Sequence, residues 1–542
     1  MITIVCTVLF SLLLIGVGIY AHKKTDDTGD EFFLGGRSIG IFATIMTLVF
    51  SIWSTLAFYG VVGEAYTNGV GSLGIAQGIF WGAGLQVFVG YKLWTLGKKY
   101  GLSTPGDFFG QRYYSNFFRF ITSLGLIYFT MPYIGMQLGG LGAGLEGAAQ
   151  VPSTVGTIFL ALVLLIFVSI GGMKSVAWTD AIQGVVFTIV VLLALFVLIK
   201  SMPEDLSVVM KKATEIRPGL NSIPGPNKLY TPIMNLHLAI TIGSFAVWPH
   251  IFVRFFIAKK RETYKVLAVA FPIYEVVCMV PLLLIGIMII PYLFGGNLNP
   301  LDAQKSIHWA MNGIPFGHLL GTGIFLAAFS AAMSTASSQL LACSSMFVGD
   351  IFLKLYKKEV SQKTVVLLGR IMTVLFVIIS TFFGIYFPNI FKTATHFATP
   401  GYAQLLPALL AGLFWKRANR EGAIFGTLGG FATLLLTSFV WKNPLGVTPL
   451  LWSLTVNCIL LVGISLVTAK PPKEVTDRFF EIDLNKEKIT PMLYGMWDKM
   501  EKMNLKKYGV SGNTSLQEDL LYFYNDKELQ FGILDINTKE II

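Results

Sequence analysis

Long apolar segments separated by short polar connections run through most of this chain. Each has about 18 or more mostly apolar residues, the length that an α-helix needs to cross the ~30 Å hydrocarbon core of a bilayer. The pattern predicts an all-α polytopic membrane protein with about 13 transmembrane helices. The predicted spans are residues 2–20, 40–62, 72–96, 117–143, 152–170, 178–201, 234–255, 265–292, 318–346, 365–387, 395–415, 423–441 and 449–467.

Composition supports a membrane protein. Of the 542 residues 54% are hydrophobic and only 13% are charged, whereas a soluble domain carries about 25% charged residues. The net charge of +11 would suggest a nucleic-acid partner in a soluble chain. Here the basic residues concentrate in alternate loops, so we expect contact with the lipid bilayer and no nucleic acid.

The distribution of basic residues predicts the orientation. Lys and Arg are enriched in the cytoplasmic loops of membrane proteins, and here they cluster after the first, third, seventh, ninth and eleventh spans, for example at Lys259 and Lys260. We therefore expect a multi-pass protein of the cell (plasma or inner) membrane with its N-terminus outside and its C-terminus cytoplasmic. The first span has no basic residue before it, so we expect a retained helix.

Small hydroxyl residues gather in one apolar segment, Gly323 to Asp350. At 3.6 residues per turn, Ala331, Ser334, Thr335 and Ser338 share one helical face. Hydroxyl and carbonyl oxygens on such a face suit a hard cation such as Na⁺. The alternative is that small residues let helices pack closely, with the hydroxyls bonded to their own backbone.

Six motifs in sequence order resemble those of the sodium/solute symporters, a family that includes sodium–proline, sodium–galactose, pantothenate, monocarboxylate and sialic acid transporters. The resemblance covers roughly residues 30–470. The motifs are GDEFFLGGRSIG (Gly29 to Gly40), LSTPGDFFGQRY (Leu102 to Tyr113), GGMKSVAWTDAIQG (Gly171 to Gly184), PHIFVRFFIAKK (Pro249 to Lys260), AAMSTASSQLLACSS (Ala331 to Ser345) and GLFWKRANREGAIFG (Gly412 to Gly426).

The resemblance implies a leucine-transporter-like fold of two five-helix inverted repeats, with the first helix of each repeat broken at mid-membrane. We expect the breaks at Ser51 to Gly63 and Gly243 to Pro249, where freed backbone groups hold ions and solute. The implied divisions are 1–38 (leading helix and cytoplasmic loop), 39–201 (first repeat), 202–233 (extracellular loop), 234–415 (second repeat), 416–469 (two further helices) and 470–542 (cytoplasmic tail).

A Na⁺ site between the first and eighth helices of the core is the main functional implication of the resemblance. Its ligands would be the backbone oxygens of Phe50, Trp53 and Ala331 and the hydroxyls of Ser334 and Thr335. The family pattern thus gives the hydroxyl face a role that spacing alone leaves open.

Asp180 lies within a predicted span. Placing a charged carboxylate inside a membrane costs free energy unless a partner compensates its charge. The resemblance implies a place on the sodium exit path or, with Ser337 and Ser338, a possible second Na⁺ site. The alternative is that Asp180 caps its helix or pairs with Lys174.

Other polar residues within spans are candidates for solute binding. Glu275 could bind solute or pair with Lys265 or Arg254, and Arg254 is expected to anchor the cytoplasmic end of its helix. The remaining candidates to line a cavity are Gln137, Ser244, Phe245, Thr395, His396 and Gln404.

Differences between this sequence and individual branches of the family limit the class of solute that it is expected to bind. The sodium–proline branch is expected to carry an acid in the first break, where this chain has Ile52, and this difference argues against proline as the solute. The amides and charges of the sugar branch are scarce here. A site without polar groups serves a polyhydroxylated sugar badly. A small carboxylate, amino acid or vitamin-like solute remains.

The resemblance therefore implies sodium-coupled secondary active symport of a small molecule by alternating access, with no enzymatic activity. The residue order of a P-loop is absent. The alternatives are a proton-coupled symporter, an uncoupled facilitator of the same fold, and a sodium-dependent nutrient sensor. The tail is polar, and helical patches near Trp497 and at Leu520 to Tyr524 could contact a protein partner.

Overall fold

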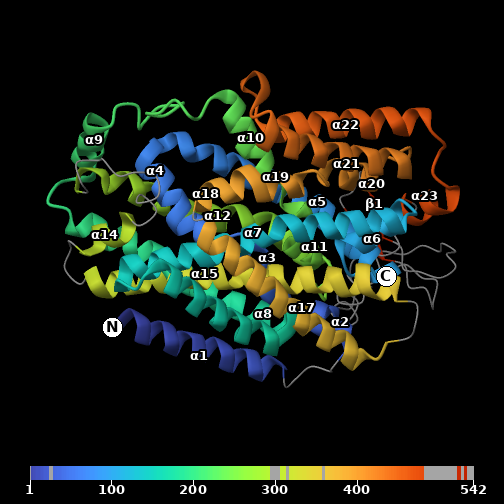
Figure 1. Cartoon of the computed structure of the whole chain (residues 1–542), viewed down its shortest axis with the longest axis horizontal. Coiled ribbons are helices and arrows are strands. Elements are labelled where there is room, and N and C mark those ends of the chain that lie inside the picture. The colour runs from blue at the N-terminus through green and yellow to red at the C-terminus, as the bar shows by residue number, and fades with distance from the viewer. Residues whose placement is uncertain are drawn as a thin grey trace. The chain divides into compact units, whose positions relative to one another are not determined.

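The computed structural model describes residues 2–22, 28–292, 306–312, 317–356, 360–387, 389–480, 522–525 and 530–533. It has two compact units, Met1–Val475 and Thr476–Ile542. The first unit is helical and contains every predicted span (Figure 1).

The elements of the first half of the chain are α1 (Ile2–His22), α2 (Gly29–Leu34), η1 (Gly35–Arg37), α3 (Ile41–Phe50), η2 (Leu56–Val61), α4 (Val62–Asn68), η3 (Gly69–Leu73), α5 (Gly74–Tyr100), α6 (Pro105–Arg112), α7 (Asn116–Ala149), α8 (Ser153–Ser201), α9 (Leu206–Ile216), α10 (Pro232–Gly243), η4 (Ser244–Val247) and α11 (Pro249–Arg254).

The elements that follow are α12 (Glu262–Met288), η5 (Ile290–Tyr292), α14 (Ser306–Asn312), α15 (Gly317–Met346), η7 (Phe347–Phe352), α16 (Leu353–Leu355), α17 (Gln362–Tyr386), α18 (Ile390–Thr393), η8 (Ala394–Ala398), α19 (Thr399–Ala403), α20 (Leu406–Phe414), α21 (Arg420–Leu435), η9 (Leu436–Val440), η10 (Pro444–Gly446), α22 (Pro449–Val467), α23 (Lys473–Phe480), β1 (Tyr522–Asn525) and β2 (Gln530–Ile533).

Length and composition support a polytopic membrane unit. Within the described residues, 9 helices are long and apolar enough to cross a membrane, or up to 10 if the bent pair Phe58–Gly71 and Gly74–Tyr100 is one span. Three shorter apolar helices, Ile41–Phe50, Ser153–Ser169 and Pro232–Val247, lie in other predicted spans. The all-α polytopic fold is confirmed, and the total of about 13 crossings stays a prediction.

The helix with the hydroxyl face lies at the centre of the unit. In the helical span Gly317–Leu355, which contains α15, 83% of the most apolar 18-residue stretch is buried. The corresponding share is 28% for α1 and for α22. α15 packs against α7 and α8, whereas α1 and α22 lie at opposite edges of the bundle (Figure 1). A hydroxyl row on α15 therefore faces protein, where polar groups find partners.

Both predicted helix breaks are confirmed. α3 ends at Phe50, and the next helical segment, the short π-helix η2, begins at Leu56. α10 ends at Gly243, and extended backbone at Trp248 separates η4 from α11, which begins at Pro249. The second break has a direct cause, because proline lacks an N–H and disfavours helical backbone in the residue before it.

A third interruption divides α8. Gly172 has φ 59° and ψ −170°, so it separates the helices Ser153–Ser169 and Gly172–Ser201. A Cβ added at Gly172 would lie 2.9 Å from the backbone oxygen of Phe32. The sharp turn and this close approach both require glycine.

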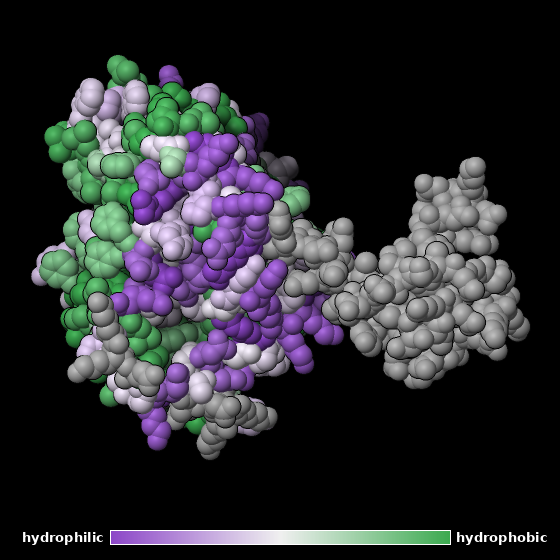
Figure 2. All heavy atoms as spheres, turned by 90° about the vertical axis from the view of Figure 1, so that its right-hand side faces the viewer, coloured by the Kyte–Doolittle hydropathy of each residue, from purple (hydrophilic) through white to green (hydrophobic). Residues whose placement is uncertain are grey.

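Contacts between loops support the alternation of the spans. At one end of the unit, Arg37 donates to the carbonyl of Gly97 (3.2 Å), and Lys259 N–H donates to the carbonyl of Ile39 (2.9 Å). These residues belong to three predicted inner loops. Figure 2 looks onto the right-hand end of Figure 1, where α6 lies, and hydrophilic residues gather across it.

Segments of the predicted outer side meet one another as well. Arg217, which follows α9, donates to the carbonyl of Tyr66 (2.7 Å), and Tyr230 donates to Glu64 (2.7 Å). In Figure 1 α4, α9 and α14 lie at the left-hand end and α6 lies toward the other. Which end faces the cytoplasm remains a prediction.

The second unit contains a short antiparallel hairpin, in which Tyr522 pairs with Ile533 and Asn525 with Gln530. The prediction of a helical patch at Leu520 to Tyr524 is therefore wrong over Tyr522–Tyr524. The consecutive aromatic residues Tyr522, Phe523 and Tyr524 have a high propensity for strands. The patch expected near Trp497 lies outside the described residues.

Candidate functional site

Oxygen atoms converge on Thr335 where α15 passes the break after α3. Thr335 Oγ1 lies 2.6 Å from the backbone oxygen of Trp53, 3.2 Å from that of Ser51 and 3.0 Å from that of Ala331. All four residues are buried. One hydroxyl has a single proton to donate, so three carbonyl oxygens around it exceed what hydrogen bonding satisfies. This excess of neutral oxygens can hold a small hard cation.

The predicted set of sodium ligands is brought together in part. Trp53, Ala331 and Thr335 meet, and Ser334 lies one position from Thr335 on the same helix. The oxygen of Phe50 accepts the N–H of Trp53 (3.0 Å) and is used within the turn. Ser51 supplies the second oxygen from the break, and residue spacing gave no signal for it.

Ser334 contributes a second buried hydroxyl. Its Oγ makes no well-formed hydrogen bond to any described residue, although it approaches the Asp180 carboxyl. Oδ1 of Asp180 is similarly buried without a well-formed hydrogen bond within the described part of the chain. Two buried oxygen atoms with unused hydrogen-bonding capacity therefore lie beside the Thr335 cluster.

Asp180 forms a fully buried ion pair with Arg254 of α11. Arg254 Nη2 lies 3.0 Å from Asp180 Oδ2, and neither side chain is exposed. Thr47 (2.5 Å) and Ser51 (3.3 Å) also donate to Oδ2. The pair joins α3, α8 and α11, because Arg254 Nε also donates to Thr47 Oγ1 (2.7 Å).

This pairing changes three interpretations made from the sequence. Lys174 pairs with Glu31 (2.8 Å), so its pairing with Asp180 is wrong. Arg254 ends α11 and is fully buried, so it joins that helix end to α3 and α8, while the expectation that this end is cytoplasmic stays a prediction. The guanidinium also donates to Ser338 Oγ and thus occupies two members of the possible second sodium site.

Ser337 and Ser338 are bonded within their own helix. Ser337 Oγ donates to the carbonyl of Ser334 (3.0 Å), and Ser338 Oγ donates to the same oxygen (2.6 Å). These bonds leave acceptor lone pairs on both hydroxyls, one of which Arg254 uses. Among the described residues no group of three His, Cys, Asp or Glu side chains could hold a metal ion.

A cavity lies beside the two helix breaks. Its described lining is mostly apolar and aromatic, with Trp53, Tyr133, Phe245 and Trp248 among its walls, and Glu275 is the one charged residue of that described lining. Trp53 Nε1 donates to Glu275 Oε1 (2.9 Å), so the predicted pairing of Glu275 with Lys265 or Arg254 is wrong. Trp53 thereby contacts the cavity carboxyl through its indole and Thr335 through its carbonyl.

Of the predicted solute-binding residues, Glu275 and Phe245 line this cavity, and Gln137, Ser244, Thr395, His396 and Gln404 are not among its described lining residues. Gln137 Oε1 accepts from the N–H and hydroxyl of Thr55, both at 3.0 Å, and so holds the start of η2. Ser244 Oγ donates to the carbonyl of Thr241 (2.7 Å) and accepts from Trp248 Nε1 (3.3 Å). Both residues shape the breaks behind the cavity wall.

The candidates after α18 face other helices. Thr395 Oγ1 and His396 Nδ1 lie 2.8 Å apart, and His237 stacks near His396 with ring centroids 5.3 Å apart. Gln404 Nε2 donates to Ser453 Oγ of α22 (2.8 Å). These contacts join α10, η8, α19 and α22, and Thr395, His396 and Gln404 are not among the described residues that line the cavity.

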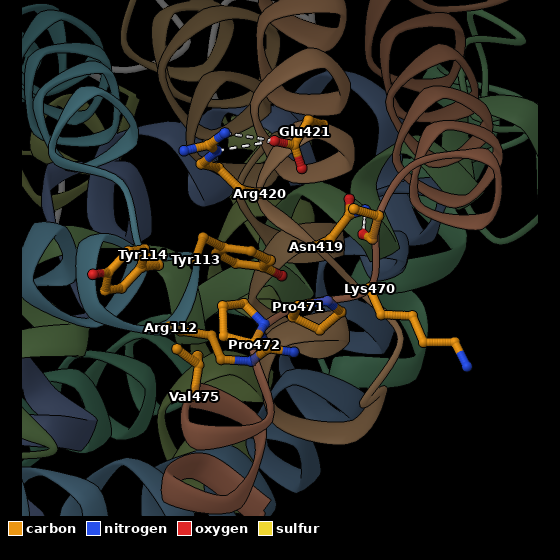
Figure 3. A pocket seen from close by; sticks show the side chains of 11 residues that line it. Arg112, Tyr113, Tyr114, Asn419, Arg420, Glu421, Lys470, Pro471, Pro472 and Val475 are labelled. Carbon is orange, nitrogen blue, oxygen red and sulfur yellow. Dashed lines mark hydrogen bonds and ion pairs between the residues drawn. The ribbon is translucent and has the colours of Figure 1, made fainter.

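A second hollow lies at the end of the unit near α6 (Figure 3). Arg112, Tyr113 and Asn419 line it, together with the chain after α22. Arg112 Nε donates to the carbonyl of Gly412 (2.7 Å), and Tyr113 donates to that of Ala408 (2.6 Å). Figure 3 shows Arg420 turned toward Glu421, to which it is hydrogen-bonded (2.8 Å). These groups hold loop backbone, and the hollow is distant from the helix breaks.

Comparison with known proteins points to one family. The residue pattern of the sodium:solute symporter family matches residues 32–430. The sodium/proline symporter of Escherichia coli (strain K12) is 26% identical over 508 residues, covering 90% of this chain and 97% of that protein. The osmoregulated proline transporter OpuE of Bacillus subtilis (strain 168) is 26% identical over 482 residues, covering 86% and 94%.

A solved structure has the same fold. A substrate-bound, outward-open Na⁺-coupled sialic acid symporter superposes with a TM-score of 0.73 at 18% sequence identity. The match covers 87% of this chain and 99% of the other. Its helical architecture is the leucine-transporter-like one expected from the motifs.

Proposed function

This chain belongs to the sodium:solute symporter family and couples the movement of a small solute to Na⁺, and we propose that the oxygen cluster around Thr335 holds the coupling ion. The observation that carries the proposal is the convergence of the backbone oxygens of Ser51, Trp53 and Ala331 on one buried hydroxyl. Oxygen ligands are those that hard cations prefer.

Ser334 completes the proposed site. Its hydroxyl is buried beside the cluster and makes no well-formed bond within the described residues, so an ion would satisfy it. Phe50, the last residue of α3, would add its backbone oxygen from the edge of the break. The site is built from α15 and from the break after α3, so an ion there would favour one arrangement of these two elements.

The solute would bind in the cavity lined by Trp53, Phe245 and Trp248, next to the proposed ion site. If Na⁺ and the solute both favour the closed arrangement, bound Na⁺ raises the affinity of the protein for the solute, and bound solute raises its affinity for Na⁺ by the same factor. A membrane potential adds ~2.3 kcal/mol per charge per 100 mV to inward Na⁺ movement. Import by alternating access follows from this linkage.

The relatives are named as transporters of proline, so proline is a candidate solute here although Ile52 stands where the sodium–proline branch is expected to carry an acid. A small amino acid, carboxylate or vitamin-like solute fits a cavity with few polar groups. The relatives are transporters, and we propose no catalytic chemistry for this chain. Asp180 would act on the sodium exit path, with Ser337 and Ser338 beside it.

The proposed arrangement in the plasma membrane places the N-terminus outside and the tail, residues 470–542, in the cytoplasm, where it is available to a protein partner. The repeats would be residues 39–201 and 234–415, with 202–233 as the extracellular loop between them. Contacts such as Arg37 with Gly97 support a common side for the predicted inner loops.

Uptake into proteoliposomes containing the full chain tests the proposal. Proline and a panel of small carboxylates and amino acids are supplied under an inward Na⁺ gradient, under a K⁺ gradient, and under an inward proton gradient without Na⁺. Accumulation that requires Na⁺ is expected. Accumulation driven by protons alone would indicate a proton-coupled symporter, and equilibration that ignores Na⁺ would indicate a facilitator. Saturable binding without uptake would indicate a sensor.

A further inference from the structure

The solute cavity contains one carboxyl group, Glu275 of α12, in otherwise apolar and aromatic surroundings. The side chain is 2% exposed. Within the described residues no basic side chain lies at ion-pair distance from it. A charge in such a place is costly unless a partner arrives.

Other buried carboxyls of the unit have more partners. Asp180 accepts from Thr47, Ser51 and Arg254, as described above. Asp350 accepts from Thr104 (2.8 Å) and Ser123 (2.7 Å), and the half-buried Glu64 accepts from Tyr230 (2.7 Å) and Asn68 (2.8 Å). The hydrogen bonds to these carboxyls come from neighbouring side chains of the same unit, so these carboxyls have a structural role.

Glu275 differs from these carboxyls in its number of hydrogen-bond donors and in its contact with the cavity. Among the described residues only Trp53 Nε1 donates to its carboxyl, although an ionised carboxylate has about four acceptor positions. Its side chain also borders the cavity. The unused acceptor capacity therefore faces the place where a solute would enter.

The cavity walls suit the organic part of a cationic solute. Tyr133 and Trp248 have ring centroids 5.7 Å apart, and Phe245 and Trp248 4.8 Å apart. Aromatic faces attract an ammonium group and pack against its methylene groups. A solute that carried only a carboxylate would be repelled by ionised Glu275.

From these observations, and resting on the proposed function, we propose that Glu275 binds a cationic nitrogen of the transported solute, so that the solute class is small organic ammonium compounds, including zwitterionic amino acids. The Trp53 indole would orient the carboxyl by holding Oε1. The same residue's carbonyl belongs to the proposed ion site, so ordering of the break by Na⁺ would also order the ammonium site.

Pairs of solutes that differ only in the cationic nitrogen test this inference. Proline is compared with tetrahydrofuran-2-carboxylate, and choline with 3,3-dimethylbutan-1-ol. Affinity for the purified full chain is measured by thermal stabilisation in NaCl and in KCl. At least one ammonium member should bind more tightly than its neutral isostere, and Glu275→Gln should lower that affinity at least about tenfold, equivalent to ~1.4 kcal/mol. The control is Glu64→Gln, a half-buried carboxyl that is not among the described residues lining the cavity, and it should keep the preference.

Stabilisation by Na⁺ alone is recorded for every variant. If Na⁺ stabilises Glu275→Gln while the ammonium preference is lost, the inference is supported. If the preference is absent in the unaltered chain or persists in Glu275→Gln, the inference is overturned while sodium coupling stands. If Na⁺ has no effect on the unaltered chain, the proposed function itself fails.

A measurement on the unaltered protein covers the case in which Glu275→Gln does not fold. A hydrophobic carbodiimide is added with Na⁺ and each solute, and its modification of Glu275 is mapped by mass spectrometry. The ammonium members should protect Glu275 and the neutral isosteres should not. Equal protection by both members of each pair would overturn the inference.

Discussion

The hydroxyl oxygen of Thr335 lies 2.6 Å from the backbone oxygen of Trp53, 282 residues earlier in the chain. The contact joins the central helix α15 to the break that follows α3. The indole of the same Trp53 donates to Glu275 at 2.9 Å. One residue thus links the proposed ion site to Glu275, the only charged side chain among the described residues that line the cavity.

The buried pair of Asp180 and Arg254 should dominate local stability. Arg254→Met leaves the Asp180 carboxyl buried without its guanidinium, and breaking such a pair costs about 3–5 kcal/mol. A clearly lower melting temperature is expected in detergent, measured by intrinsic fluorescence. Replacing both residues, Asp180→Leu with Arg254→Met, should recover part of the loss because neither charge remains.

The control for that prediction is the exposed pair of Lys212 and Glu204, 2.5 Å apart. Solvent screens such pairs and they contribute little, so Lys212→Met should leave the melting temperature unchanged. A melting temperature for Arg254→Met as high as that of Lys212→Met would contradict a structural role for the buried pair.

The same pair predicts a sodium stoichiometry of one. Arg254 already neutralises Asp180 and donates to Ser338, so two members of the possible second sodium site are occupied by an internal cation. The Na⁺ dependence of uptake at saturating solute should therefore have a Hill coefficient near one. A coefficient clearly above one that falls to one in Asp180→Asn would show a second ion at this place.

Close packing between α7 and α17 should depend on Gly139. A Cβ added there would lie 2.4 Å from the backbone oxygen of Gly384. Gly139→Val should separate these helices and lower the melting temperature, because overpacking costs about 1–3 kcal/mol. Gly463→Val on α22 is the control, since nothing lies within 4 Å of its added Cβ. Equal melting temperatures of the two variants would contradict this packing.

The sequence was most informative where a pattern is local. Hydropathy located the helices, and Pro249 located the second break, because proline acts on the residue directly before it. The place of Trp53, Ala331 and Thr335 followed from motif resemblance. Their oxygens do converge, although their role as sodium ligands remains a prediction.

Interactions across the bundle could not be read from the sequence. Asp180 and Arg254 are 74 residues apart, and their meeting depends on the rotation of α8 and α11 about their axes. The same uncertainty made Gln404 a cavity candidate, whereas its side chain points to Ser453 of α22. Ser51 was missed because any residue at a helix break offers a backbone oxygen, whatever its side chain.

The central claim is that the oxygens around Thr335 hold the coupling ion, and Na⁺ affinity tests it most directly. Thr335→Ala removes one ligand and should weaken Na⁺ binding by about 1.5–3 kcal/mol, the usual contribution of a bond to a charged group, whereas Thr335→Ser should retain much of the affinity. Ser330→Ala is the control, because Ser330 on the same helix donates only to the carbonyl of Leu326 (2.8 Å). Na⁺ titration of the purified chain, followed by thermal stabilisation, should show the loss in Thr335→Ala alone. Unchanged Na⁺ affinity in a folded Thr335→Ala protein would contradict the account.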